Sequence, residues 1–430
     1  MTASRRPRVC LIVVFLVLLG AVTPSQVVLE LREGETPQIV ELFRQMPTPA
    51  NCRRLEGGLE SRCQIAQMVR PWMQYARFVL FEDAGDQALL GQSGWFFYKP
   101  GVQYLIEPCP SGLGGTLKRS LGVDSIAGGK PSPRPAALRL PPGRAMDSGP
   151  GSQSDLLAAI VSFRDDLAKR GIRLLLLPAP NKESIYPERL AGLTESMPAP
   201  VNPTTRAVLA KLKEAGVEIV DLFEVYGSRR SARSPDEVGE LNPQSAIHNP
   251  QSIQYYLAQD SHWSPEGMRL AAETVARRLL DSGWVEKGAV PYEMKPVSVE
   301  RHGDVLRMIR VSQVERLFPP ERMNCTQVLD ARTGKPYADD PNSPVLVLGD
   351  SFLRIFERDE PGSGGFLAHL AYHLGFGLTS LVNDGGASTL VRQQLARKPA
   401  LLRGKKVVVW EFVERDIRFG TEGWQVIPLP

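Results

Sequence analysis

A short apolar run, Val345 to Leu348, constrains the fold more than any other stretch of this chain. No polar side chain interrupts it, and Gly349, Asp350 and Ser351 follow directly. Such a run predicts a strand that is buried on both faces, as in a parallel sheet covered by helices. The hydroxyl of Ser351 would then lie at the carboxyl edge of the sheet, where α/β proteins bind their ligands.

Helices and strands alternate over most of the second half of the chain. Apolar residues at helical spacing follow Ser154 and Pro203, and each helix is expected to stop at a glycine before a short apolar run. Two further runs follow Ser351 in the sequence, and each ends in polar residues or glycine. The additional strands are expected at Ile172 to Leu177, Val217 to Val220, Gly377 to Val382 and Lys406 to Trp410. This order predicts an α/β fold with a mostly parallel central sheet.

Ser351 is the candidate nucleophile, and it requires a base and an acid that orients the base. His262, one of five histidines, lies in the motif Asp260-Ser261-His262-Trp263. Ser264 is expected to cap the helix that follows this motif. A lone Gly-Asp-Ser or Asp-x-His is more often a turn or a surface pair. Together, the serine, histidine and aspartate favour acyl transfer through a covalent ester.

The N-terminus has the pattern of a targeting segment. A basic tract, Arg5 to Arg8, precedes the apolar run Val9 to Val22. This run is short for a membrane span, and it predicts either a cleaved secretory signal or an uncleaved signal anchor within residues 1–25. A buried core helix explains this apolar run less well. We therefore expect the rest of the chain to be exported, with the N-terminal segment able to anchor it to the membrane.

Four cysteines lie outside the N-terminal run, and export would expose them to an oxidising compartment. They predict two disulfides, with three connectivities that the sequence does not separate. A zinc site is less consistent with their spacing, and we expect neither a metal nor another cofactor. The four residues are Cys52, Cys63, Cys109 and Cys325.

Composition also sets domain boundaries and excludes one class of partner. The 51 Lys and Arg residues nearly balance the 47 Asp and Glu residues, so we expect no nucleic-acid binding.

Residues 111–153 are rich in Gly, Pro and Ser and predict an insertion or linker, and residues 227–251 predict a second, polar insertion. Residues 26–110 are assigned to the N-terminal part of the domain, and residues 154–430 to its core.

The motifs resemble a known family. Gly349-Asp350-Ser351, followed by Asn383 to Ser388, is similar to the first two sequence blocks of SGNH hydrolases. An Asp-x-His-Trp motif upstream of the serine resembles the alginate O-acetyltransferases of the AlgJ/AlgX type. Other segments that resemble this group, in the same order, are Gly94 to Tyr98, Pro180 to Pro187, Asp260 to Gly267 and Trp410 to Asp416. The resemblance implies a three-layer SGNH-hydrolase-like fold.

The resemblance also implies roles for individual residues. Ser351 would be the nucleophile, His262 the base and then the acid, and Asp260 the group that fixes the imidazole tautomer. The oxyanion would bind the Ser351 amide and an amide at Gly385 or Gly386.

The asparagine that SGNH enzymes usually supply from a third block is missing here. Arg415, Arg354 or Asn383 could replace it, although an ion pair or a turn cap explains each of them equally well. Lys182 and Tyr186 are candidate contacts to a polysaccharide, with packing as the alternative.

The implied acceptor is an exopolysaccharide, alginate-like or other, in the periplasm or at the outer face of the inner membrane. The implied acetyl donor is a membrane-bound O-acyltransferase. Two alternatives remain open from the sequence: a carbohydrate acetylesterase that uses the same residues with water, and a non-catalytic polysaccharide-binding or assembly protein.

Overall fold

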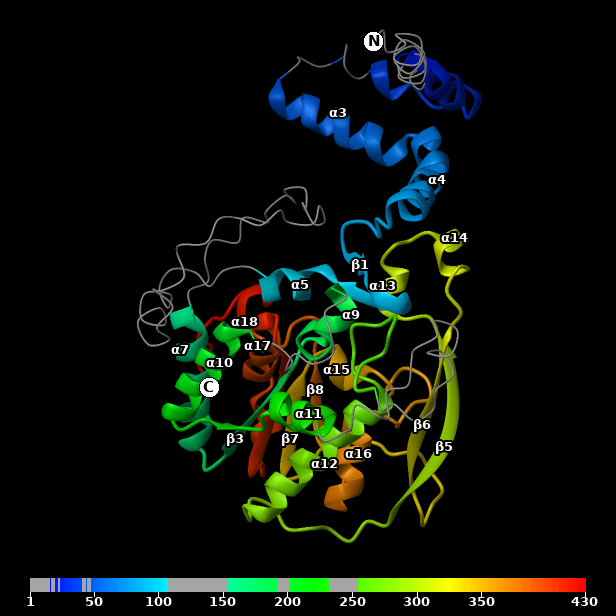
Figure 1. The fold of residues 1–430 in the computed structure, drawn as a ribbon. Helices are drawn as coiled ribbons and strands as arrows, with labels where there is room; N and C mark the ends of the chain where they lie inside the picture. The colour runs from blue at the N-terminus through cyan, green and yellow to red at the C-terminus, as the bar shows by residue number, and fades with distance from the viewer. Residues whose placement is uncertain are drawn as a thin grey trace, which may run out of the picture. The chain divides into compact units, whose positions relative to one another are not determined.

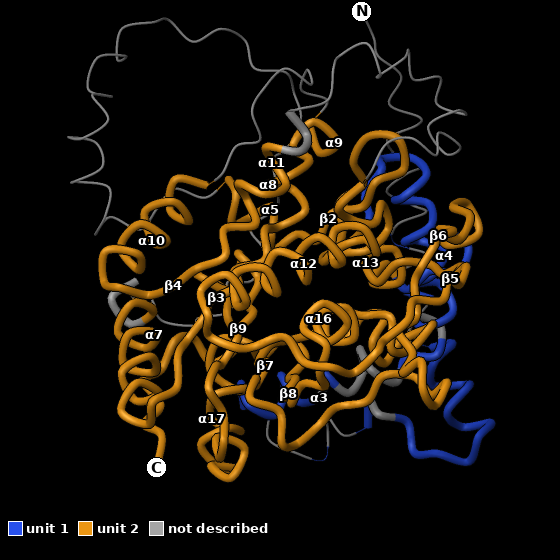
Figure 2. The backbone as a smooth tube through the Cα atoms, turned by 90° about the horizontal axis from the view of Figure 1, so that it is seen from below, with its two compact units in different colours: residues 1–84, 310–314 blue, residues 85–309, 315–430 orange. Residues whose placement is uncertain are grey.

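The structure, a computed structural model, describes residues 24–40, 48–106, 153–191, 202–231 and 254–430, with the isolated positions 16, 20, 21 and 44. The chain divides into two units (Figure 2). The first comprises residues 1–84 and 310–314, and the second comprises residues 85–309 and 315–430. The second unit thus begins within the stretch 26–110, which the sequence assigns to the N-terminal part of the domain.

The first unit is helical. Residues 24–32 form a helix, and the other elements are η1 (Gln38–Val40), α3 (Pro49–Arg62), α4 (Gln64–Phe81) and the start of α14 (Ser312–Glu315). Among the helices of the described residues, none has the length and apolar composition to cross a bilayer. Most of the apolar run Val9 to Val22 lies outside the described residues, so the signal or anchor stays a prediction.

The second unit is built on a five-stranded parallel sheet with the order β4-β3-β9-β7-β8 (Figure 1). All of the strand candidates in the sequence are present. Their bounds are β3 (Arg173–Ala179), β4 (Glu218–Ile219), β7 (Val345–Gly349), β8 (Thr379–Val382) and β9 (Val407–Val413). Strand β9, the last in the sequence, lies in the middle, between β3 and β7.

Alternate residues of the strands pack into two separate cores, one on each face of the sheet. Leu175 and Leu177 of β3 join the core that includes helices α12 (Pro265–Asp281) and α16 (Phe366–Leu374). Leu174 and Leu176 join the core that includes α7 (Gln153–Ala168) and α10 (Pro203–Glu214). Helices therefore cover both faces, and the predicted three-layer α/β fold is confirmed.

The remaining elements of the second unit surround this sheet. They are α5 (Lys99–Ile106), α8 (Lys182–Ile185), α9 (Pro187–Ala191), α11 (Leu222–Ser231), α13 (Asp304–Arg307), α15 (Ser351–Arg354), α17 (Leu390–Arg397), η2 (Gln92–Gly94), η5 (Pro399–Leu402) and α18 (Asp416–Phe419). Residues 111–152 and 232–250 lie outside the described residues, so the two insertions stay predictions.

Two antiparallel hairpins complete the unit. The short one pairs β1 (Ala88–Leu90) with β2 (Phe96–Tyr98), as the aromatic run in the sequence suggests. The long one pairs β5 (Tyr292–Arg301) with β6 (Glu321–Asp330), and the sequence analysis missed it. Most side chains of β5 are exposed or half-buried, so its sequence lacks the apolar pattern of a buried strand.

The prediction of two disulfides is wrong. Cys325 on β6 is a free, buried thiol that faces Val297 across the hairpin and packs in the apolar core. Cys52 is also free, and α3 separates it from Cys63 by about three helical turns, which is too far for a bond. Cys109 lies outside the described residues.

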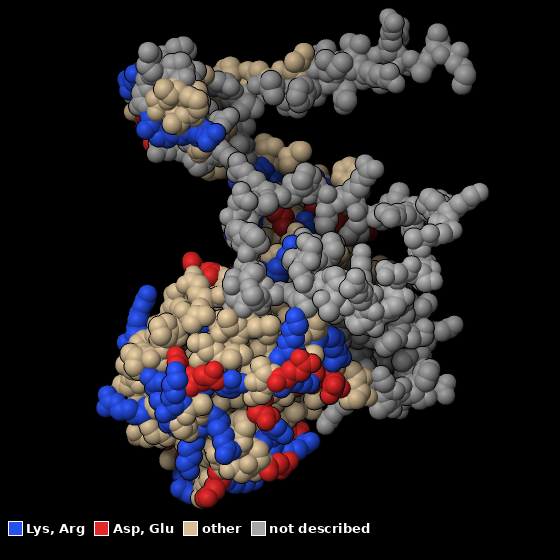
Figure 3. Space-filling view, turned by 90° about the vertical axis from the view of Figure 1, so that its left-hand side faces the viewer, with Lys and Arg blue, Asp and Glu red and all other residues tan. Residues whose placement is uncertain are grey.

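Charged side chains of both signs are interspersed over the face of the molecule that Figure 3 shows. This distribution agrees with the near balance of acidic and basic residues in the sequence.

Candidate active site

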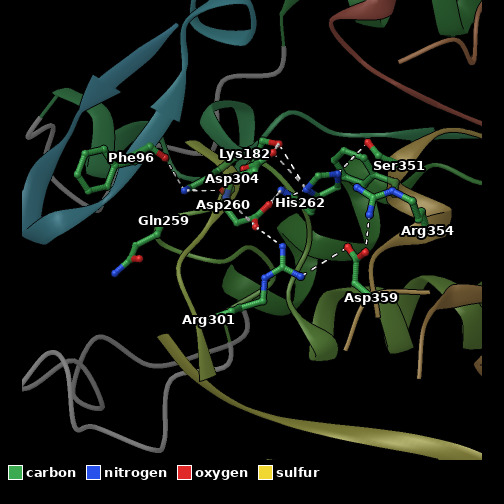
Figure 4. A network of polar contacts seen from close by, with 12 residues as sticks. Phe96, Lys182, Gln259, Asp260, His262, Arg301, Asp304, Ser351, Arg354 and Asp359 are labelled. Atoms are coloured by element: carbon green, nitrogen blue, oxygen red, sulfur yellow. Dashed lines mark hydrogen bonds and ion pairs between the residues drawn. The ribbon is translucent and has the colours of Figure 1, made fainter. Parts of the chain in front are cut away.

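Ser351, His262 and Asp260 meet at the carboxyl edge of the sheet (Figure 4). The Nε2 atom of His262 lies 2.9 Å from the Oγ atom of Ser351. The Nδ1 atom of the same ring lies 2.6 Å from the Oδ1 atom of Asp260. An ionised carboxylate only accepts hydrogen bonds, so Nδ1 carries the proton and Nε2 of the neutral ring can accept the serine hydroxyl.

The turn after β7 presents Ser351 at the start of α15. Asp350 is the N-cap residue of this helix, and its side chain accepts a hydrogen bond of 2.9 Å from the Phe352 amide. Gly349 is required by close packing, since a Cβ atom there would lie 2.5 Å from the carboxylate of Glu411. Phe352 packs against the imidazole of His262, with 4.8 Å between the ring centroids. The serine and the histidine are thus held in place by neighbouring side chains.

The loop that carries Asp260 and His262 is fixed by the helix that follows it. As predicted, Ser264 caps α12, and its hydroxyl accepts a 3.1 Å hydrogen bond from the Gly267 amide. A β-bridge between Tyr256 and Trp263 closes the loop. Both members of the Asp-x-His pair are buried, with Asp260 0% and His262 5% exposed.

Asp260 is held as a carboxylate by hydrogen bonds on both oxygens. Oδ1 accepts the backbone amide of His262 at 3.1 Å, and Oδ2 accepts the Asp304 amide and an Arg301 guanidinium nitrogen, each at 3.1 Å. Burial alone would raise the pKa of Asp260. The attraction of His262 and Arg301 and the hydrogen bonds outweigh it, so the pKa is lowered.

The segment Arg301-His302-Gly303-Asp304 completes this arrangement, and the sequence analysis did not find it. Besides donating its amide to Asp260, Asp304 accepts both the amide and the hydroxyl of Ser261, each at 2.7 Å. A Cβ atom at Gly303 would lie 2.1 Å from the carbonyl carbon of Gln259, so only glycine allows this approach. The run Arg301-His302-Gly303-Asp304, a glycine among residue types common in active sites, is the signal that could have identified the segment.

The two carboxylates next to His262 also affect its protonation. Burial lowers the pKa of His262, but Asp260 and then Asp304 stabilise the imidazolium, so the net effect raises it. The Oδ2 atom of Asp304 lies 3.5 Å from Nδ1 of His262. Burial and the charge of Asp260 raise the pKa of Asp304 itself to about 6.

Asp260, His262 and Asp304 also have the composition of a metal site, with one atom of each within 4.8 Å of the others. The hydrogen bonds of the two carboxylates argue against this use. A cation would compete with the guanidinium of Arg301 and with the Asp304 amide for Oδ2 of Asp260. The residues therefore fit hydrogen bonding to a histidine better than metal coordination.

A group of buried acids includes Asp350, the residue before Ser351. Asp350, Glu411 and Asp416 are all at most 7% exposed, and an oxygen of Glu411 accepts the Asp350 amide at 3.1 Å. Burial, and then the charge of Asp350, raises the pKa of Glu411 well above its usual range. The same two effects raise the pKa of Asp416 to about 7.

Arg415 lies next to these acids, with its guanidinium carbon 5.2 Å from the ring centroid of Tyr98. Burial lowers its pKa, but Asp416 and Asp350 outweigh this effect and raise it. Arg415 therefore supplies positive charge close to the residue that precedes Ser351.

The turn after β8 contains the expected glycines. Gly385 adopts a left-handed conformation with φ +67°, and Gly386 donates its amide to the Asn383 carbonyl at 2.9 Å. The Asn383 amide in turn bonds to the Gly349 carbonyl at 3.0 Å, which ties this turn to the one that carries Ser351. Within the described part of the chain, the amides of Ser351 and Gly385 donate no hydrogen bond. Of the two glycines, Gly385 is therefore the better candidate for an oxyanion donor.

Arg354 belongs to a chain of ion pairs that connects the glycine turn after β8 with Asp260 (Figure 4). It contacts Asp359, and its Nε atom lies 2.9 Å from a carboxylate oxygen of Asp384 in the glycine turn. Asp359 also pairs with Arg301 at 3.6 Å, and Arg301 contacts Asp260. The positive charge of Arg354 is thus already balanced by two carboxylates.

Lys182 and Tyr186, the candidate contacts to a polysaccharide, are buried and hydrogen-bonded within the protein, which favours the packing alternative. Lys182 is 3% exposed, and its ammonium donates hydrogen bonds to the carbonyls of Phe96, Ala258 and Asp260 at 2.6, 2.7 and 3.1 Å. Tyr186 is 6% exposed, and its hydroxyl accepts the Tyr255 amide at 2.8 Å. Both side chains are used to hold the loops around the site.

Comparisons with known proteins support the three-layer α/β fold described above. A family model described as an SGNH hydrolase-like domain, acetyltransferase AlgX, matches residues 147–414. Two curated relatives, each described as a probable alginate O-acetylase AlgJ, are 23% identical to this chain: that of Pseudomonas fluorescens over 274 residues and that of Azotobacter vinelandii over 270. The matches cover 62% and 61% of this chain and 62% of each relative.

A solved structure has the same fold. The O-acetyltransferase domain of Pseudomonas putida AlgJ superimposes with a TM-score of 0.50 and 20% sequence identity. The match covers 77% of this chain and 92% of that domain.

Proposed function

The chain belongs to the family of SGNH hydrolase-like domains of the acetyltransferase AlgX, and from this we propose that it is an exported O-acetyltransferase. It would transfer an acetyl group through Ser351 to a hydroxyl of an alginate-like exopolysaccharide. The observation that carries the proposal is the continuous contact from Ser351 through His262 to Asp260 in a family-matched domain. The names of the AlgJ relatives support the acceptor.

In the first step, the Oγ atom of Ser351 attacks the carbonyl carbon of the acetyl donor, and its proton moves to Nε2 of His262. The tetrahedral intermediate then collapses. Its bond to the donor oxygen breaks, and His262 returns the proton to this leaving oxygen. The products are the acetyl ester of Ser351 and the deacetylated donor.

In the second step, a sugar hydroxyl attacks the acetyl ester while His262 accepts the hydroxyl proton. The bond to Oγ breaks, and His262 gives the proton back to Ser351. Asp260 stabilises the imidazolium in both steps, and the amides of Ser351 and Gly385 are proposed to bind the oxyanion. The acetyl donor is proposed to be a membrane-bound O-acyltransferase that supplies acetyl groups to the periplasmic side.

The test is intact-mass analysis after incubation with a chromogenic acetyl ester, with and without an oligosaccharide acceptor. We expect a transient acetyl adduct on wild-type protein that disappears as acetylated sugar forms. Ser351→Ala should give no adduct, and His262→Ala should give almost none. Release of acetate alone, with no acetylated sugar for any acceptor tested, would identify an esterase and overturn transfer. No adduct and no turnover, with retained saccharide binding, would point to a binding protein.

A further inference from the structure

Helix α4 of the first unit exposes an unusual number of large apolar side chains. A soluble protein normally buries such residues or scatters them singly. We call the following six residues the α4 stripe: Met68, Val69, Trp72, Met73, Val79 and Leu80. Their exposed fractions range from 47% for Val69 to 70% for Leu80.

The six residues lie on one side of the helix. At 100° per residue, they fall within an arc of about 140° that runs from Met68 to Met73. Phe78, a residue of α4 that is buried within the protein at 5% exposure, lies outside this arc. The α4 stripe is therefore a separate apolar face, distinct from the side of the helix that packs inside the protein.

Outside the stripe, α4 carries glutamines and arginines, together with the buried Phe78 and the exposed Phe81 at its C-terminal end. Arg77 and Arg70 follow next around the helix beyond Met73, and the helix contains no Asp or Glu. Arg77 also pairs with Asp83, just beyond the end of the helix. An apolar face with tryptophan, bordered by arginine and free of acidic residues, is typical of a helix that lies in a membrane interface.

Two other occupants of the stripe fit less well. A second copy of α4 would bring like-charged arginines together, and for Arg70 neither helix offers a carboxylate partner. A span across the bilayer is excluded because α4 does not have the apolar composition to cross it. A lipid surface instead accepts the apolar arc in its acyl region, and its phosphate oxygens accept hydrogen bonds from guanidinium groups.

We propose that α4 lies along a phospholipid surface with the α4 stripe inserted among the acyl chains. This contact is additional to the predicted N-terminal segment of residues 1–25. It does not depend on the activity proposed above, since the first unit contains none of the active-site residues.

The test uses the full chain and vesicles of phosphatidylcholine with phosphatidylglycerol, in which some acyl chains carry bromine. Bromine quenches tryptophan fluorescence only at close range. Because the chain has six tryptophans, the difference between wild type and Trp72→Phe isolates the signal of position 72. We expect acyl-chain bromine to quench this signal, even if residues 1–25 also hold the protein on the vesicle.

Two variants define the surface. Met68→Ser/Leu80→Ser should weaken vesicle partitioning on the order of a hundredfold if the stripe provides the contact, or abolish quenching of Trp72 if residues 1–25 keep the protein bound. The matched control Leu317→Ser/Val426→Ser changes two apolar side chains of the second unit, each 50% exposed. It should change neither vesicle partitioning nor the quenching of Trp72.

Absence of Trp72 quenching on vesicle-bound wild type would overturn the proposal. A wild-type dimer that becomes monomeric in the stripe variant, with no quenching, would assign the stripe to a second copy instead. Hydrolysis of a soluble acetyl ester by the same samples reports on the active site separately, so loss of that activity would not be mistaken for failure of lipid binding.

Discussion

Asp260 and Asp350 are both buried aspartates, one beside the histidine and one beside the serine, yet their pKa values shift in opposite directions. Burial raises the pKa of each, but Asp260 faces His262, Arg301 and two backbone amides, which lower it overall. Burial is also the largest effect on Asp350, and the Phe352 amide and the charge of Arg415 offset it only in part, so its pKa stays raised. Burial alone therefore does not determine whether an active-site carboxyl is charged; its hydrogen-bond donors do.

The largest expected effect separates these two aspartates. Asp260→Asn should lower kcat for acetyl transfer about 10⁴-fold, because an amide no longer stabilises the imidazolium or fixes its tautomer. Asp350→Asn should lower it less than about tenfold, because the asparagine oxygen can still cap α15 through the Phe352 amide. Steady-state kinetics on both variants, with circular dichroism as a check of folding, measures the difference. Equal losses would show that the two aspartates have the same role.

A second prediction concerns the cation that holds the loop of Asp260. Lys182→Met should lower the free energy of unfolding by about 3 kcal/mol, because the carbonyls of Phe96 and Asp260 lose this donor while that of Ala258 keeps the Phe96 amide. Lys182→Arg does not restore the geometry, since a planar guanidinium replaces a compact ammonium. Urea unfolding of both variants at pH 7 is the measurement. A loss below about 1 kcal/mol would mean that these carbonyls find other donors.

A third prediction concerns Glu411, in the group of buried acids near Asp350. The stability of the protein should depend on the shape of this side chain more than on its charge. Glu411→Gln should change the free energy of unfolding by less than about 1 kcal/mol, because burial raises the pKa of this carboxyl and so favours its neutral form. Glu411→Ala should cost about 3 kcal/mol, since it leaves a cavity and removes the acceptor of the Asp350 amide. If Glu411→Gln is as destabilising as Glu411→Ala, Glu411 is ionised in the folded protein.

The smallest expected effect is a shift of the pH profile. The proposed mechanism requires neutral His262, whose pKa is raised, so activity should fall as the pH drops through a value above its usual 6.5. Asp304→Asn removes one carboxylate that stabilises the imidazolium and should move this acid limb to lower pH by about one unit or less.

The matched control for that shift is Ser261→Ala, which removes a hydrogen bond to Asp304 but keeps its carboxyl group. Because that hydrogen bond lowers the pKa of Asp304, the control should move the acid limb in the same direction but less than Asp304→Asn does. The profile of kcat/KM against pH measures both variants. An unchanged limb in Asp304→Asn would show that Asp304 does not influence the titration of His262.

The sequence alone predicts those parts of the structure that depend on neighbouring residues along the chain. The apolar runs of β7 and β9 predict buried parallel strands, and Ser264 with Pro265 predicts the start of α12. The same local patterns predict that Ser351 follows a strand and that His262 precedes a helix. The need of a serine nucleophile for a base, rather than a local pattern, predicts that the two residues lie near one another.

Only the tertiary structure decided which partners surround them. Arg301 and Asp304 lie some forty positions beyond Asp260 in the sequence and reach it through the β5–β6 hairpin, whose half-exposed strands carry no clear apolar pattern. Lys182 has the sequence context of a surface loop, and only its three carbonyl acceptors show that it is buried. Local propensity and periodicity are properties of a segment, whereas burial and protonation depend on groups from distant segments.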